Sequence, residues 1–259
     1  MKKTITLLLV FLTTWTFAQE TGTYQADSVY KSNKVKLRKW YSGTNKKGGR
    51  TMYYDREGRL TKNEVELNLG ATKVSTYYIY DQSGRLNAMV DSTKNSEPDK
   101  KQVKELKKMG INPQLILRTV GPELEVSKYE LEYDGDDLIK QTKFNPNGSI
   151  DFIVHIDGKR VKEIKDWYRN GSVYRQDTTE FITQFHKAKY YGWQLNNGTK
   201  LSWNYRFEYK FDERGRVLSY TRFDGEVEKE TATFTYDSNG LLIETSGYAP
   251  NYFEYEYYD

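Results

Sequence analysis

The sequence predicts an all-β protein: an antiparallel meander of short tyrosine–aspartate hairpins that forms an open or rolled sheet, with one short helix near residues 97–109. Apolar and polar residues alternate with a period of two along several segments, and a D-x-x-G turn pattern repeatedly follows them. Aromatic residues make up 15% of the chain, and 23 of them are tyrosines, which suit a sheet with one half-buried face. We expect roughly ten to fourteen antiparallel strands.

Four copies of the turn pattern are strong, and each has an aromatic residue before the Asp and an aliphatic residue after the turn. They run from Tyr54 to Leu60, Tyr80 to Leu86, Phe211 to Val217 and Tyr236 to Leu242. The Asp can accept hydrogen bonds from backbone N–H groups just ahead of it, and the Gly can adopt a positive φ that closes a hairpin. These aspartates are therefore predicted to be structural.

The predicted helix interrupts the repeats. Ser96 is a suitable N-cap with Asp99 three residues later, and Gly110 is a suitable stop. Three apolar residues spaced three apart share one face, and lysines cover the rest. This pattern favours a surface helix packed at an edge or end of the sheet, with a partner-docking helix as the alternative.

The first 18 residues predict a cleaved secretory signal peptide. Lys2 and Lys3 give a cationic start, an apolar run follows, and Ala18 is a small residue at the expected cleavage point. The run of about 13 residues is shorter than the roughly 20 that a transmembrane helix needs. We expect a signal peptide over 1–18 and a single β-repeat domain over 19–259, exported to the periplasm or beyond the cell, with no transmembrane segment.

Composition restricts the classes of partner. Without the two N-terminal lysines, the 40 basic residues fall to 38 against 36 acidic ones, which argues against nucleic acid as a partner because such proteins carry a basic excess. The chain has no cysteine, so thiol catalysis and disulfides are excluded and stability must come from packing and hydrogen bonds.

The stretch from Tyr78 to Leu86, Y-I-Y-D-Q-S-G-R-L, resembles the YD repeat of Rhs-type proteins. The resemblance covers the chain from about Thr51 onward and implies an antiparallel β array. In large members such strands wind into a shell around a toxic C-terminal domain, and this short exported chain resembles the repeats without the toxin. Residues Gly49 to Gly58 are similar to the hairpin repeats of membrane-occupation-type and antitoxin-like exported proteins, which also form open sheets.

No constellation of residues predicts catalysis or metal binding. The two histidines, His155 and His186, have no ligand spacing around them. Asp134, Asp136 and Asp137 cluster in an acidic turn without the spacing of a calcium loop; a calcium site there is the weaker alternative. We therefore expect no catalytic residue, no metal and no cofactor.

The aromatic residues on or beside strands form the candidate binding set, because exposed rings with cationic and amide neighbours can stack on sugar rings or bind peptide surfaces. The set comprises Trp40, Tyr41, Trp167, Tyr168, Trp193 and Trp203. The alternative is that these rings form the core.

The sequence therefore predicts an exported, non-enzymatic binding module for glycan or protein at the cell envelope. An immunity-like or antitoxin-like partner of one specific protein is the first alternative. A hydrolase with a site assembled from dispersed carboxylates is the second.

Overall fold

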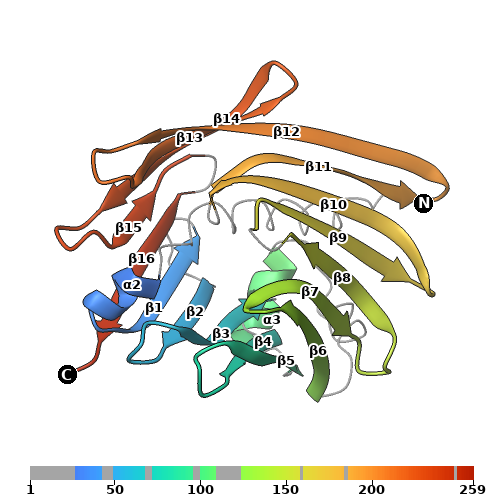
Figure 1. Cartoon of the computed structure of the whole chain (residues 1–259), viewed down its shortest axis with the longest axis horizontal. Coiled ribbons are helices and arrows are strands. Elements are labelled where there is room, and N and C mark those ends of the chain that lie inside the picture. The colour runs from blue at the N-terminus through green and yellow to red at the C-terminus, as the bar shows by residue number, and fades with distance from the viewer. Residues whose placement is uncertain are drawn as a thin grey trace.

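The chain forms a closed antiparallel β-barrel. The computed structural model describes residues 27–42, 49–67, 72–95, 100–108, 124–157, 160–183, 186–247 and 250–259. Within them, sixteen strands each pair with the next along the chain, and the last pairs with the first. Figure 1 shows the first strand, in blue, beside the last, in red. The predicted antiparallel meander is confirmed, whereas the open or rolled sheet and the smaller strand number were wrong.

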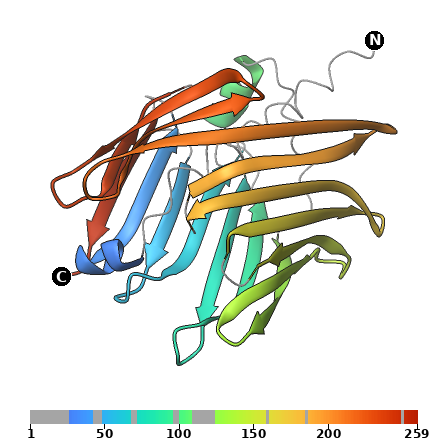
Figure 2. The same ribbon diagram turned by 45° about the horizontal axis from the view of Figure 1, so that its top comes forward.

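The first half of the barrel is built from β1 (Val35–Ser42), β2 (Gly49–Tyr54), β3 (Leu60–Leu67), β4 (Thr72–Tyr80), β5 (Leu86–Asn95), β6 (Leu124–Asp134), β7 (Asp137–Phe144) and β8 (Ile150–Ile156). The second half is built from β9 (Lys162–Arg169), β10 (Ser172–Thr183), β11 (His186–Asn196), β12 (Thr199–Phe211), β13 (Val217–Asp224), β14 (Val227–Tyr236), β15 (Leu242–Thr245) and β16 (Asn251–Tyr257). The β11–β12 hairpin is long and extends past its neighbours (Figure 2).

Two helices are described. The predicted helix is present as α3 (Lys100–Lys108), and its expected caps, Ser96, Asp99 and Gly110, lie outside the described residues. A shorter helix that the sequence did not predict, α2 (Asp27–Ser32), precedes β1. The Tyr30 ring of α2 stacks on Tyr54 with centroids 4.4 Å apart, so α2 is held by the barrel.

The D-x-x-G segments form the predicted turns. In the third copy, Gly215 has a φ of 76°, and Asp212 Oδ1 accepts hydrogen bonds from the backbone N–H groups of Arg214 at 3.0 Å and Arg216 at 2.8 Å. The same aspartate forms an ion pair with Arg216 at 2.7 Å. The remaining three strong copies also place their glycines at positive φ, at Gly58, Gly84 and Gly240.

In the three strong copies that carry an Arg after the Gly, this Arg and the Leu or Val that follows it connect the turn to a later hairpin. The Arg216 guanidinium lies 4.7 Å from the centroid of the Tyr236 ring, and the Tyr236 hydroxyl donates to the carbonyl of Val217 at 3.0 Å. Arg59 and Tyr80 show the same arrangement. The Arg59 guanidinium lies 4.9 Å from the centroid of the Tyr80 ring, and the Tyr80 hydroxyl donates to the carbonyl of Leu60 at 3.0 Å. The sequence pattern of the repeat thus encodes contacts between hairpins as well as within one.

One face of the sheet is apolar and buried, and it lies inside the barrel. Trp40 on β1 and Phe253 on β16 face each other across the closing pair of strands, and each is only 6% exposed. Phe207 and Phe234 belong to the same core cluster. Closing a sheet crowds side chains on its concave side, and large rings on a convex surface could not be covered this completely.

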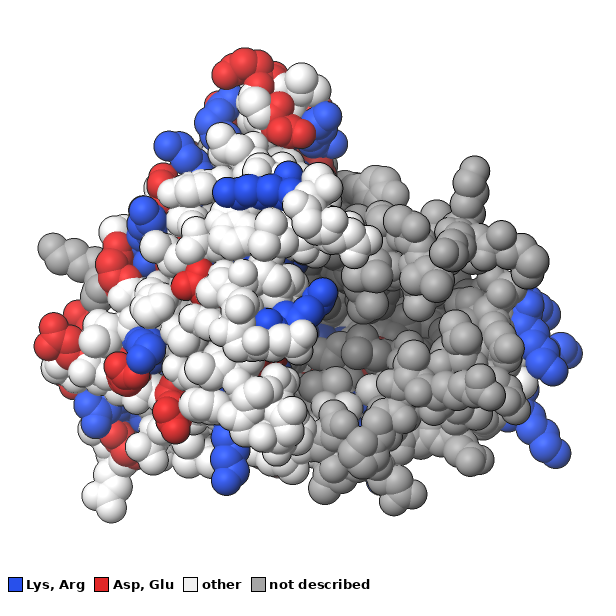
Figure 3. Space-filling model, turned by 90° about the vertical axis from the view of Figure 1, so that its right-hand side faces the viewer, with Lys and Arg blue, Asp and Glu red and all other residues white. Residues whose placement is uncertain are grey.

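The outer face carries many charged side chains, and several of them pair across strands. Lys39 Nζ lies 2.9 Å from Glu256 across the β1–β16 seam, and Lys140 lies 2.6 Å from Glu132 between β7 and β6. Figure 3 shows basic and acidic side chains interspersed over the described part of one side of the molecule.

Glu64 is the most strongly held of the outer carboxylates. Lys62 and Lys73 lie 2.7 and 2.9 Å from its Oε1, and Tyr53 donates to its Oε2 at 2.7 Å. Burial opposes ionisation of Glu64, but hydrogen bonds from Lys62, Lys73 and Tyr53 outweigh it and lower the pKa from 4.5 to about 2. Because the folded pKa is depressed, the ionised carboxylate stabilises the fold above the unfolded pKa, and this contribution is lost as the pH falls toward 2.

Replacing Gly215 by Val is expected to destabilise the protein by about 1–2 kcal/mol, because a β-branched residue is strained at positive φ. A Cβ atom there would meet no atom within 4 Å, so the loss reports backbone strain rather than a clash at the Cβ. Urea unfolding measures it. Arg214→Val, at an exposed position of the same turn, is the control and should change little; equal effects of the two substitutions would contradict the turn geometry.

Replacing Glu64 by Gln should lower the free energy of unfolding at pH 6, and the difference from the unaltered protein should shrink as the pH falls from about 4.5 toward 2. Urea unfolding at several pH values gives this profile. Glu130→Gln serves as the control, since Glu130 is exposed. A Glu64→Gln deficit that is the same at pH 6 and pH 2.5 would show that the carboxylate charge does not stabilise the fold.

Candidate functional site

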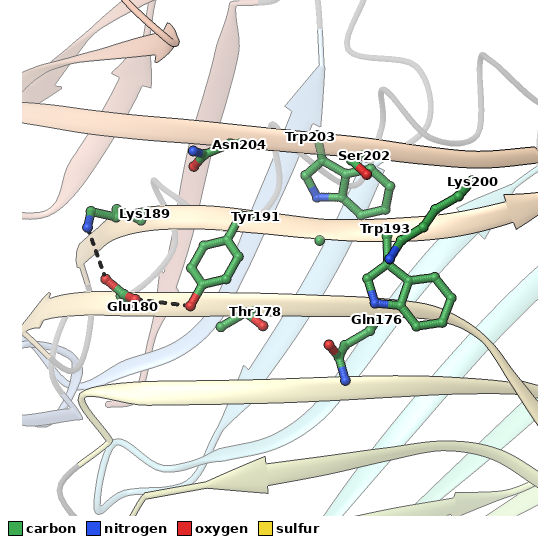
Figure 4. Close-up of a pocket in the computed structure, with 11 residues that line it drawn as sticks. Gln176, Thr178, Glu180, Lys189, Tyr191, Trp193, Lys200, Ser202, Trp203 and Asn204 are labelled. Carbon is green, nitrogen blue, oxygen red and sulfur yellow. Dashed lines mark hydrogen bonds and ion pairs between the residues drawn. The ribbon is translucent and has the colours of Figure 1, made fainter.

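A hollow of about 520 Å³ opens on the polar face of strands β10, β11 and β12. Strand register arranges its lining in cross-strand rows. Gln176, Trp193 and Ser202 form one row, and Thr178, Tyr191 and Asn204 form the next. Directly paired residues project from the same face of a sheet, so these side chains share the outer surface (Figure 4).

The β11–β12 turn fixes this arrangement. Asn197 and Gly198 have φ values of 49° and 81°, as a type I′ hairpin turn requires. The turn pairs Asn196 with Thr199. Because the register of β11 and β12 continues from this pair without a shift, it also sets Trp193 opposite Ser202. Asn-Gly is a dipeptide that this type of turn prefers. The Trp193 and Tyr191 rings, two residues apart on one strand, therefore lie about 7 Å apart along the surface.

Gly192 lies between Tyr191 and Trp193 on β11, so a side chain at this position would project from the opposite, inner face of the sheet, where Asp177 and Trp203 are its paired neighbours. A Cβ at this position would lie 2.1 Å from the carbonyl oxygen of Gln176 and 2.9 Å from Cζ2 of Trp203. Any side chain at residue 192 would therefore force the neighbouring strand or the Trp203 ring to move. The absence of a side chain lets both neighbours approach β11 closely.

One end of the hollow is electrically balanced. Lys189 Nζ lies 3.6 Å from Glu180 Oε2, and the Tyr191 hydroxyl donates to Glu180 Oε1 at 3.1 Å, as the dashed lines in Figure 4 show. At the other end, Lys200 Nζ lies 4.9 Å from the centroid of the Trp193 ring. The lining of the hollow thus combines three aromatic residues, two of them on the outer face, with amide and hydroxyl groups, one carboxylate and two lysines.

Buried polar contacts brace the inner side of the same strands. Asp177 on β10 accepts hydrogen bonds from Trp167 Nε1 at 2.7 Å, from the Tyr190 hydroxyl at 2.5 Å and from Arg175 Nε at 2.8 Å. Burial raises the pKa of Tyr190, with Asp177 adding to the effect. The network joins β9, β10 and β11 beneath the hollow, so its rows are held in fixed positions.

The structure brings together two of the six aromatic residues predicted as a binding set. Trp193 and Trp203 both line the hollow. Trp193 is half-buried on the outer face. The Trp203 ring packs against the core cluster and stacks on Tyr190 with centroids 6.2 Å apart, so it supports the hollow more than it forms its surface.

The other four predicted residues lie elsewhere. Trp40 belongs to the core, and the Trp167 ring packs on Phe152 with centroids 5.2 Å apart while its Nε1 is bonded to Asp177. Tyr41 is on β1 and Tyr168 near the end of β9, each half-buried. The expected grouping of all six residues is therefore not found.

Sequence reasoning missed several polar residues of the hollow, namely Gln176, Thr178, Glu180, Lys189, Lys200, Ser202 and Asn204. A signal for part of this set was present. Once Asn197-Gly198 is taken as a two-residue hairpin turn, counting outward places Ser202 opposite Trp193 and Asn204 opposite Tyr191. The β10 residues had no comparable signal, because the β10–β11 pairing contains register shifts near Phe181.

No family model matches the sequence, and no curated protein matches it. Among solved structures, the chain is similar to a porin-like protein from Bacteroides uniformis ATCC 8492, with a TM-score of 0.38 and 11% sequence identity, over 86% of this chain and 98% of that one. An identity this low does not carry a function from one chain to the other.

Within the part of the chain that the structure describes, no helix is both long and apolar enough to cross a membrane. The fold and the site together define a closed antiparallel β-barrel with an aromatic core, charged side chains on its outer face and a polar, aromatic hollow on three long strands.

Proposed function

We propose that the protein is an exported, non-enzymatic binding module that holds carbohydrate in the hollow of β10, β11 and β12. The observation that carries the proposal is the pair of outer rings, Trp193 and Tyr191, set beside hydrogen-bonding groups of Gln176, Ser202 and Asn204. Sugar rings have apolar C–H faces and polar edges, which aromatic faces and amides match respectively.

The groups of the hollow support binding rather than hydrolysis. Among the described lining residues, Glu180 is the one carboxylate, and it is already engaged by Lys189 and Tyr191. Glycoside hydrolysis commonly uses a pair of carboxylates, one as acid and one as base or nucleophile. A single engaged carboxylate therefore favours the binding module over the hydrolase.

The charged outer face supports a barrel that works in an aqueous compartment of the cell envelope. Lys39, Lys62, Lys73 and Lys140 project from it in ion pairs with glutamates. Lysines on the lipid-facing side of a membrane barrel cost about 2–4 kcal/mol each at the midplane. Rows of such residues favour contact with water, in keeping with an exported protein.

A specific protein partner is the second candidate, on the basis of two exposed apolar side chains beyond the hollow. Leu195 and Leu201, near the tip of the β11–β12 hairpin, are 42% and 51% exposed. An immunity-like partner could use this tip together with the rings. The absence of carbohydrate binding would favour this candidate.

Replacing Trp193 by Ala should weaken carbohydrate binding by at least about 2 kcal/mol, since aromatic anchors concentrate binding energy. Isothermal titration with cellotetraose, xylotetraose, chitotetraose and tetragalacturonate first shows which of these sugars the unaltered protein binds. The same titration of the Trp193→Ala protein then measures the loss of affinity. Trp193→Phe keeps a ring and should lose less.

Tyr41→Ala is the matched control, because Tyr41 is a half-buried aromatic residue on β1, away from the hollow. Its affinity should be unchanged, and circular dichroism should show that all variants fold. Binding by the Trp193→Ala protein at the original affinity would place the ligand elsewhere, and a lack of binding to all four sugars would reject the carbohydrate proposal.

A further inference from the structure

The hollow has an uncompensated positive charge at one end. Lys200 is exposed on β12, in the cross-strand row next to that of Trp193 and Ser202. Within the described residues, no carboxylate lies within 4.0 Å of its ammonium group, which lies instead 4.9 Å from the centroid of the Trp193 ring.

Other lysines of the outer face differ from Lys200 in this respect. Five of the described lysines on this face contact a glutamate: Lys39 with Glu256, Lys62 and Lys73 with Glu64, Lys140 with Glu132 and Lys189 with Glu180. Cross-strand pairing of opposite charges is thus common on this surface. Lys200 departs from it at the point where the largest outer ring of the hollow lies.

The lining residues carry a net positive charge as a result. Lys189 and Glu180 neutralise each other at one end, and Lys200 remains at the other. A neutral ligand would gain nothing from that charge. A ligand with a carboxylate at one edge would gain a charge-assisted hydrogen bond, which is stronger than a neutral one.

We infer that the carbohydrate held in this hollow is acidic, a glycan that contains hexuronic acid. Its pyranose ring stacks on Trp193 and its carboxylate contacts Lys200. The lysine has a flexible four-carbon stem, so its ammonium group can leave the ring face and meet the carboxylate at the ring edge. This inference rests on the proposed function, because it assigns a substrate class to the same hollow.

The experiment compares tetragalacturonate with neutral xylotetraose by isothermal titration at low salt. The unaltered protein should bind the acidic sugar more tightly. Lys200→Gln should weaken tetragalacturonate binding about tenfold, as expected for loss of a hydrogen bond to a charged group, and leave xylotetraose unaffected. Lys200→Arg should retain the preference, and raising the salt concentration should weaken only the acidic sugar.

Lys210→Gln is the matched control, since Lys210 is an exposed lysine on the same face of β12, and it should leave both affinities unchanged. Equal binding of the two sugars, with no effect of Lys200→Gln, would overturn the inference and leave carbohydrate binding intact. If neither sugar binds, and cellotetraose and chitotetraose do not bind either, the proposed function itself is rejected. Equal losses in Lys200→Gln and Lys210→Gln would also overturn the inference, because they would report only general charge attraction.

Discussion

The pairing of β1 with β16 is the contact on which the rest of the structure depends. It joins residues more than 200 positions apart, such as Trp40 with Phe253 and Tyr41 with Tyr252, and it removes both free edges of the sheet. Closure also gives the sheet an inside and an outside. Arg38, fully buried on β1, bonds to Tyr30 of α2 at 2.6 Å and lies 4.5 Å from the Phe253 ring, so the seam also holds the helix.

Closure and the hairpin repeats act at different ranges. Each D-x-x-G turn fixes its own hairpin, and where an Arg follows the Gly it contacts a Tyr of a later hairpin, as Arg216 does with Tyr236. These contacts join each hairpin to the next, but they do not determine how many strands form before the sheet closes. The inside placement of the rings leaves charged pairs on the outer face, and the hollow is a place where two outer rings, Trp193 and Tyr191, lie beside polar side chains.

Local features of the fold could be predicted from sequence, whereas closure and side-chain direction could not. The D-x-x-G turns, the α3 helix and the Asn197-Gly198 turn all have short-range signals, and each is present in the structure. No local signal marks β1 as the partner of β16, and α2 is too short to show a period. Trp40 and Trp193 have similar strand contexts, yet one points inward and the other outward. Register shifts such as that between Lys210 and Phe211 change which face a residue occupies, so counting along the chain fails across them.

Disulfide trapping across the seam tests closure most directly, because the natural chain has no cysteine. In a Tyr41→Cys/Tyr252→Cys protein the two positions are directly paired, and such antiparallel pairs have Cα atoms about 4.5–5.5 Å apart, within the range for a disulfide. The control is Tyr41→Cys/Glu244→Cys, since Glu244 lies one strand further on, opposite Tyr252, about 10 Å from residue 41. A closed barrel predicts rapid, complete oxidation of the first protein in its folded state and little in the control. Free thiols in both folded proteins, or equal oxidation of the two, would contradict closure.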